Sequence, residues 1–167
     1  IPLFQPQGKT YNILFNILYA LFLLPSFRLY DKQNGEAVTL SSQNIIKFSN
    51  FIINKYYQNK ISSIGEDAVQ YSDTDSNYIK SIPLWPNKHE VDEVEIYNNV
   101  QKISKEVCEY VNKSLFWLAS NHFNAKKCRL LFQEEKISKR AFWGQAKKRY
   151  AQLSVEIVDG KLKEKID

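Results

Sequence analysis

The hydrophobic period of this 167-residue chain changes along its length, and that change restricts the folds open to it. Apolar residues recur at helical spacing from Thr39 to about Tyr57 and from Val94 to about His122, which predicts two amphipathic helices. Between these helices the apolar residues form two short runs around the turn-forming segment 73–77, which predicts a β-hairpin with a carboxylate-rich tip. The strand residues are Ala68, Val69 and Tyr71 before the turn, and Tyr78, Ile79 and Ile82 after it.

The remaining segments complete a mixed fold. A further helix is predicted over residues 9–24, because the residue before Pro25 avoids the helical region of backbone space. The segment from Arg129 to Leu162 is rich in strand-forming residues and contains the turn signal Asp159-Gly160. Its strands are expected around 130–132, 141–143 and 150–158, and irregular segments at 26–36 (with the turn signal Asn34-Gly35), 60–66 and 83–92. The sequence has no internal repeat, and we expect one compact α+β unit.

Composition excludes several classes of protein. At 44% apolar residues the chain can bury a core, and its ten Gly and Pro residues exclude collagen-like and proline-rich chains. Cys108 and Cys128 are expected to be reduced thiols, and His89 and His122 have no neighbouring second ligand for zinc. The most apolar stretch, 13–24, is shorter than the roughly 20 residues of a membrane-spanning helix. Because the chain begins at Ile1 and contains no Met, we expect it to be a piece of a longer protein.

Positive charge is concentrated in one segment. Residues 126–150 contain nine Lys or Arg and two Glu, which gives +7 in a chain whose net charge is +5. Phe132, Phe142, Trp143 and Tyr150 are interleaved with these basic residues. Basic and aromatic residues together are typical of a nucleic-acid surface, but lysines also protect the solvated edge of a sheet from pairing. Both interpretations remain open at this point.

The hairpin tip contains two acidic residues, Asp73 and Asp75. On an extended strand, residues two apart point to the same face, and neighbouring carboxylates repel unless a cation lies between them. An EF-hand loop starting at Asp73 would need Gly at its sixth position and Glu at its twelfth, where this chain has Tyr78 and Leu84. The remaining alternatives are a Mg²⁺ site completed by water and phosphates, and an acidic turn without a metal.

Three motifs occur in the order and with gaps that resemble those of family B DNA-dependent DNA polymerases. The segment 71–76, Y-S-D-T-D-S, resembles the palm-hairpin signature Y-G-D-T-D-S, with Ser72 in place of the usual Gly. The segment 147–151 reads K-K-R-Y-A, as in the family motif that lies against the primer-template minor groove. Segment 16–20, N-I-L-Y-A, resembles the fingers motif N-S-L-Y-G. Similar family-like segments are 27–31 (F-R-L-Y-D), 36–40 (E-A-V-T-L) and 141–144 (A-F-W-G, as in the phage branch).

The chain also departs from the family pattern. Asn12 stands where the fingers motif has a Lys that reaches the nucleotide triphosphate; Lys9 is three residues away. Ile17 and Ala20 replace the usual Ser and Gly. The palm motif that supplies the other metal-binding Asp, the exonuclease segment and the thumb are not found in this sequence.

The resemblance implies a fragment of a DNA-directed DNA polymerase, with residues 1–30 from the fingers and residues 31–167 forming a palm. It implies an antiparallel palm sheet with packed helices, two Mg²⁺ ions held with the help of Asp73 and Asp75, and a cytoplasmic location. The implied partners are primer-template DNA, a deoxynucleoside triphosphate (dNTP) and the N-terminal part of the polymerase, without a membrane. By the same resemblance Asn16 and Tyr19 face the nascent base pair, and the residues that contact DNA are Lys147, Lys148, Arg149 and Tyr150.

Two other hypotheses remain. The chain could be a non-catalytic nucleic-acid-binding relic or a split subunit with a palm fold, which the departures at Asn12 and Ala20 favour. It could also be an unrelated basic α+β protein with chance motifs, although three ordered matches disfavour this interpretation.

Overall fold

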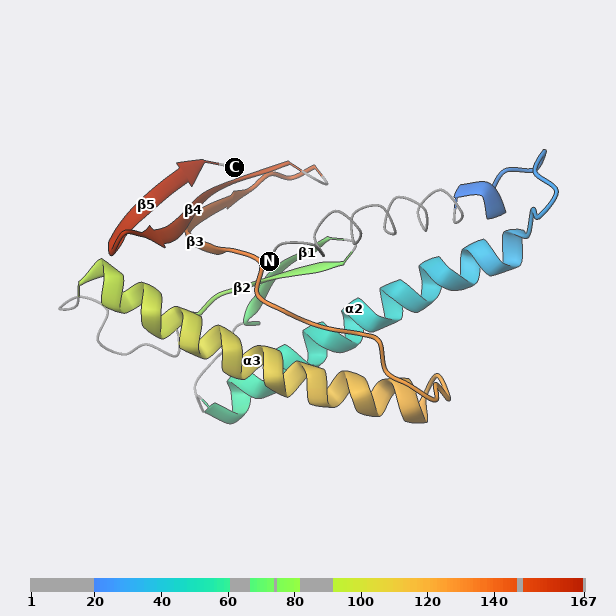
Figure 1. Ribbon diagram of the computed structural model, residues 1–167, viewed down its shortest axis with the longest axis horizontal. Helices are drawn as coiled ribbons and strands as arrows, with labels where there is room; N and C mark the ends of the chain where they lie inside the picture. Colours follow the sequence, from blue (N-terminus) through green and yellow to red (C-terminus); the bar gives the residue numbers. More distant parts are fainter. Residues whose placement is uncertain (1–19, 61–66, 74, 82–91, 147–148, 167) are drawn as a thin grey trace. The chain divides into compact units, whose positions relative to one another are not determined.

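The computed structural model describes residues 20–60, 67–73, 75–81, 92–146 and 149–166 (Figure 1). The chain forms two compact units, Ile1–Asn44 and Ile45–Asp167, rather than the single unit expected. The boundary lies within helix α2, Lys32–Lys60, which is part of both units. The combination of long helices with antiparallel strands confirms the α+β class.

The first unit shows why α2 begins earlier than predicted. Asp31 precedes the helix, and its carboxylate accepts hydrogen bonds from the Asn34 backbone N–H at 3.1 Å and the Asn34 Nδ2 at 2.7 Å. This side chain satisfies donors of the first helical turn, so Asn34-Gly35 is helical and not a turn. The preceding helix, of which residues 20–22 are described, ends before Pro25 as predicted. Residues 9–19 of its predicted range lie outside the described residues.

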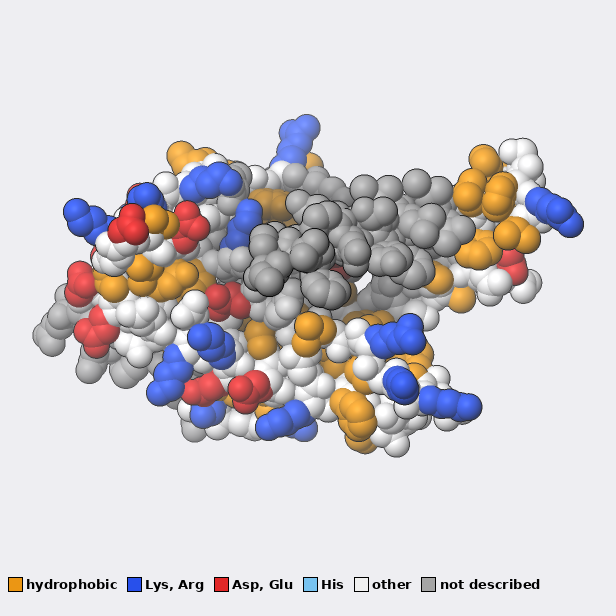
Figure 2. Space-filling view, in the orientation of Figure 1, with side chains coloured by type: hydrophobic (Ala, Val, Ile, Leu, Met, Phe, Trp, Pro, Cys, Tyr) orange, Lys and Arg blue, Asp and Glu red, His pale blue; other side chains and the backbone are white. Residues whose placement is uncertain are grey.

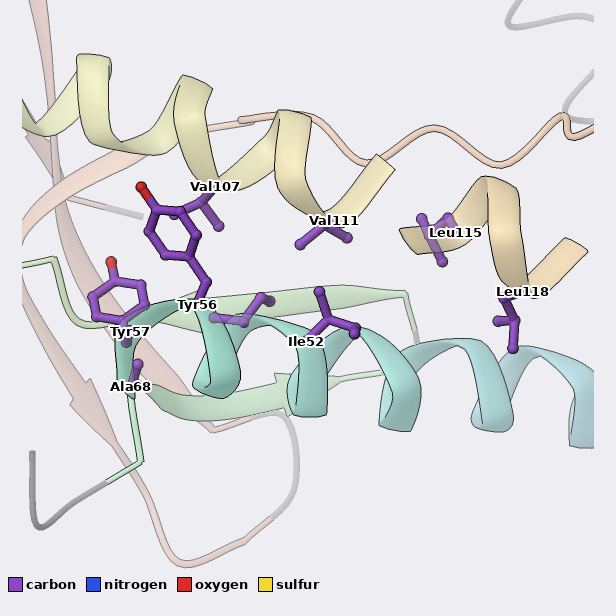
Figure 3. Packing of buried hydrophobic residues seen from close by; sticks show 9 residues of the cluster. Ile52, Tyr56, Tyr57, Ala68, Val107, Val111, Leu115 and Leu118 are labelled. Atoms are coloured by element: carbon purple, nitrogen blue, oxygen red, sulfur yellow. The ribbon is translucent and has the colours of Figure 1, made fainter. Parts of the chain in front are cut away.

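The core of the second unit forms between α2 and α3, Glu93–Asn121. The bounds of α3 agree within one residue with the predicted helix. Figure 3 shows Val107 and Val111 of α3 opposite Ile52 and Tyr56 of α2. The buried cluster comprises Ile52, Ile53, Tyr56, Tyr57, Ala68, Val107, Val111, Leu115 and Leu118.

Two antiparallel sheets belong to this unit. Strands β1, Val69–Asp73, and β2, Ser76–Ile79, form the predicted hairpin. A second sheet has the order β3-β4-β5, with β3 at Ile137–Trp143, β4 at Tyr150–Val158 and β5 at Lys161–Ile166. The predicted turn at Asp159-Gly160 joins β4 to β5 and is confirmed.

The strand predicted at 130–132 is wrong. This segment is irregular, and its polar backbone atoms bond to a helix side chain instead of a strand. Asn112 of α3 donates from Nδ2 to the carbonyl of Phe132 and accepts from its N–H, both at 2.7 Å. A single asparagine therefore replaces two ladder hydrogen bonds.

Cys108 and Cys128 are free thiols and partly buried, as predicted. Burial is the main cause that raises the pKa of Cys108 above its ordinary value. Within the described ranges, none of the helices has the length and apolar character needed to cross a membrane.

Candidate functional site

The carboxylate pair lies at the tip of the β1–β2 hairpin, as predicted. Asp73 is the last residue of β1 and pairs with Ser76, whose hydroxyl donates to the Asp73 carbonyl at 3.2 Å. Asp75 is exposed in the turn between the strands. Because Asp75 is not on a strand, strand alternation does not determine the direction of its side chain, contrary to the sequence argument.

One face of the hairpin is hydrogen-bonded to α2. The Oδ1 atom of Asn54 accepts from the backbone N–H groups of Ala68 at 2.9 Å and Val69 at 3.2 Å, where β1 begins. One helical turn earlier, Asn50 Oδ1 accepts from the Ser72 hydroxyl at 3.1 Å and from Asn77 Nδ2. Residues four apart share a helix face, so these two asparagines bind both ends of the hairpin.

The opposite face contacts the β3–β4 pair through four aromatic rings. Tyr71 stacks on Trp143 with ring centroids 4.9 Å apart and an interplanar angle of 15°. Tyr78 meets the same Trp143 edge to face at 4.6 Å, and Tyr150 lies 5.6 Å from both Tyr78 and Trp143. Such offset and edge-to-face pairs are favourable arrangements of aromatic quadrupoles. We call Tyr71, Tyr78, Trp143 and Tyr150 the aromatic cluster.

The aromatic cluster brings two of the sequence motifs together. Tyr71 belongs to the segment 71–76, and Tyr150 to the segment 147–151. Along β1, Tyr71 and Asp73 are two apart and therefore share a face. Asp73 thus projects from the hairpin face that contacts β3 and β4. Burial, followed by a hydrogen bond with Tyr150, raises the pKa of Tyr78 to about 12.

The loop between β3 and β4 makes a close turn beside this cluster. The Gly144 N–H donates to the Arg149 carbonyl at 2.7 Å, and the Arg149 N–H donates to Ala146 at 3.2 Å. A Cβ atom on Gly144 would lie 2.8 Å from the Arg149 carbonyl oxygen, so this position favours glycine. Arg149 is exposed and directly precedes β4, as predicted. An open hollow is lined by Phe142, Gly144, Gln145, Ala146, Arg149, Tyr150 and Ala151.

Other predicted site residues lie outside the described residues. These are Lys147 and Lys148, and Asn16 and Tyr19 of the fingers-like segment. Asp73, Asp75, Arg149 and Tyr150 all belong to the second unit, and Tyr150 contacts Tyr71 and Tyr78 of the hairpin. The placement of the remaining residues stays a prediction.

The basic segment 126–150 is divided between different environments. Lys139 forms ion pairs with Glu93 of α3 at 2.5 Å and with Glu164 of β5 at 3.0 Å. The side-chain hydrogen bonds of Lys139 with Glu93 and, to a smaller extent, with Glu164 raise the pKa of Lys139. Figure 2 shows blue and red side chains intermingled over α3 and over the β5 edge. Part of the positive charge of this segment is therefore neutralised locally by ion pairs.

Sequence reasoning missed Asn50, Asn54 and the packing role of Trp143. A signal for the asparagines was present, because they interrupt the apolar face of the helix next to Ile53 and Tyr57. Polar residues in such a face need hydrogen-bond partners. The ring contacts of Trp143 depend on tertiary structure and had no comparable local signal.

The described residues contain no group of three or more His, Cys, Asp or Glu side chains that could hold a metal ion. Asp73 and Asp75 nevertheless offer the oxygen donors that Mg²⁺ prefers, and Mg²⁺ is usually bound by one or two carboxylates together with water and phosphates. The donor set therefore fits a metal that takes its other ligands from elsewhere.

Comparison with known proteins identifies one relevant similarity. Over 116 residues the chain is 31% identical to the DNA-directed DNA polymerase of Enterobacteria phage T4. The match covers 60% of this chain and 13% of the phage protein, so the chain spans a small part of that relative. The sequence matches no protein-family model.

Proposed function

We propose that this chain is a palm-containing part of a family B DNA-directed DNA polymerase. The main support is one structural observation: the aromatic cluster connects the carboxylate hairpin to the strand that follows Arg149. A polymerase needs carboxylates and duplex contacts in one neighbourhood, because the primer end must lie where the metal ions act. The partial identity with the phage T4 polymerase supports the same function independently of this geometry.

The carboxylates of this chain have a defined role in the proposal. Asp75, exposed at the tip, binds Mg²⁺ directly, and Asp73 is a second ligand or orients the first. When bound, a pair of Mg²⁺ ions supplies activation of the primer 3′-hydroxyl and stabilises the pyrophosphate that leaves. The additional Asp that the family pattern requires comes from a segment outside this sequence.

The basic residues hold the duplex in the proposed polymerase. Lys147, Lys148, Arg149 and Tyr150 contact the primer-template near the primer end, and Asn16 and Tyr19 face the nascent base pair and the dNTP. Base-pair acceptors in the minor groove are nearly degenerate, so cations there tolerate every Watson–Crick pair. This tolerance suits an enzyme that copies all sequences.

Asp75→Asn in the full-length protein that carries this sequence tests the proposal. We expect nucleotide incorporation to fall at least about 100-fold, because a lost interaction with developing charge commonly has that effect. Affinity for a primer-template duplex should stay within about twofold, since it depends on cation contacts to phosphates. Primer extension and fluorescence anisotropy on the same preparation measure the two quantities.

Asp159→Asn is the matched control, because it removes the same charge from the turn of the other hairpin and Asn tolerates the positive φ there. It should leave incorporation unchanged. Incorporation by Asp75→Asn at the wild-type rate would contradict the proposal. A wild-type protein that binds duplex but extends no primer at any Mg²⁺ concentration would support the non-catalytic relic or split subunit instead.

A further inference from the structure

A small polar network connects α2 to the carboxylate hairpin just behind its tip. Ser72 and Asn77 are cross-strand partners, and both donate to the same acceptor, Oδ1 of Asn50. Asn77 Nδ2 also lies 3.4 Å from the Ser72 hydroxyl oxygen, which closes the network. Ser72 directly precedes Asp73, and Asn77 lies two residues after Asp75, so the two donors flank the carboxylates in the chain.

The hairpin needs such support from outside. Its strands have five and four residues, and an isolated two-stranded hairpin of this size is marginal in water. The aromatic cluster covers one face, but ring contacts tolerate small shifts of one ring against another. Hydrogen bonds depend strongly on distance and angle, so the bonds of Asn50 near the tip and of Asn54 at the start of β1 restrict the orientation of the hairpin on α2.

The network also gives a role to a departure from the family pattern. Ser72 stands where the polymerase signature has Gly, and glycine has no side chain that could donate to Asn50. All three side chains of the network are partly buried. Loss of the shared acceptor would take the Asn50 bond from both donors and would leave Asn77 Nδ2 with only the long contact to the Ser72 hydroxyl oxygen.

We propose that Asn50 is a positioning residue for the carboxylates, which fixes the direction of the hairpin tip through Ser72 and Asn77. The link to catalysis rests on the proposed polymerase function, whereas the fixation of the hairpin does not. The proposal therefore has two separate readouts, one of backbone protection and one of metal dependence.

Asn50→Leu tests the first readout in the full chain by amide hydrogen exchange. We expect amides of β1 and β2 to exchange about tenfold faster or more, since two hydrogen bonds are lost. Amides in the middle of α3 should change less than about threefold. Asn50→Asp replaces the amide oxygen with carboxylate oxygens that also accept hydrogen bonds, and should keep most of the protection. Asn59→Leu, an exposed asparagine of the same helix, is the matched control and should change neither set.

The second readout uses the full-length protein. With Asn50→Leu we expect the Mg²⁺ concentration for half-maximal incorporation to rise about tenfold, while duplex affinity stays within twofold. Unchanged protection of β1 and β2 would overturn the proposal, even if Asp75→Asn abolishes incorporation. Lost protection with an unchanged Mg²⁺ requirement would also overturn it, because the tip would then move without affecting the carboxylates.

A third variant keeps the test decisive if Asn50→Leu does not fold. Ser72→Ala removes one of the two donors, and we expect about threefold faster exchange in β1 and β2. If Asp75→Asn stays fully active, the polymerase proposal fails, and the exchange data alone decide whether Asn50 fixes the hairpin. Equal acceleration of exchange in α3 and in the hairpin would indicate a general loss of stability and would contradict the positioning role.

Discussion

Two hairpins of the second unit have an aspartate at the turn, and they are stabilised in different ways. In the β4–β5 hairpin, Asp159 and Gly160 have φ values of 54° and 72°, the left-handed conformation that matches the twist of paired strands. Both turn residues are exposed, and a Cβ atom on Gly160 would meet nothing within 4 Å. The β4–β5 hairpin is therefore stabilised by the local conformation of its turn and by the long ladder of hydrogen bonds between its strands.

The β1–β2 hairpin depends on other elements instead. Asn50 and Asn54 bind one face, and Tyr71 and Tyr78 pack on Trp143 from the other. Its strands are shorter than β4 and β5, so the hydrogen bonds between them contribute less to its stability. The comparison indicates that an aspartate in a turn is not by itself a functional site. Support from two sides distinguishes the hairpin that we propose to bind metal.

The largest expected effect is that of Trp143→Ala. Removing this ring deletes contacts with three tyrosines, and we expect the free energy of unfolding to fall by about 3 kcal/mol. Amide protection in β1 and β2 should fall more than protection in β5. Denaturant titration and hydrogen exchange measure the two effects.

Phe142→Ala is the control for this substitution, because Phe142 lies on the same strand with 70% of its surface exposed. We expect a loss below about 1 kcal/mol for this variant. Equal losses for the two variants would show that the aromatic cluster has no special role in supporting the hairpin.

A smaller effect is expected for Gly160→Ala. An L-residue in the left-handed conformation costs about 1 kcal/mol, so the free energy of unfolding should fall by that amount. Gly160→Asn should lose less, because Asn tolerates positive φ. Faster hydrogen exchange should be confined to β4 and β5. Loss of protection in β1 and β2 as large as that in β4 and β5 would contradict the local origin of the stability of the β4–β5 turn.

Much of the fold follows from local sequence signals. The apolar stripe predicted α3 within one residue, and turn-forming residues located both hairpin turns. Prediction failed where a side chain satisfied backbone groups from outside the local pattern. Asp31 caps α2 and makes Asn34-Gly35 helical, and Asn112 takes the hydrogen bonds that a strand at 130–132 would have used.

The residue types of the candidate site could be predicted from the sequence, but the contacts that hold the hairpin against α2, β3 and β4 could not. The acidic tip and the position of Arg149 before β4 both agree with the sequence interpretation. Tyr150 and Trp143 were interpreted as aromatic residues of a basic nucleic-acid surface, and the structure also packs both of them against Tyr71 and Tyr78. Sequence separation of some 70 residues between these rings leaves no local pattern from which their contact could be inferred.

The smallest expected effect concerns alkaline pH and Tyr78 of the aromatic cluster. Burial also raises the pKa of Tyr56 and Tyr57 in the core, so comparison with Tyr78→Phe is needed to isolate the contribution of Tyr78. Burial and the hydrogen bond with Tyr150 raise the pKa of Tyr78 from 10.0 to about 12, so the folded state holds this proton more tightly than the unfolded state. The stabilisation is complete below pH 10, and it decreases as pH rises from 10 towards 12 because the unfolded chain ionises first. Between pH 8 and pH 10.5 the ratio of folded to unfolded protein should fall in both proteins. We expect this fall to be about fourfold larger for the wild type than for Tyr78→Phe. Denaturant titrations at the two pH values measure this difference. Parallel behaviour of the two proteins would show that the hairpin does not shield the Tyr78 hydroxyl, and would weaken the distinction between the two hairpins.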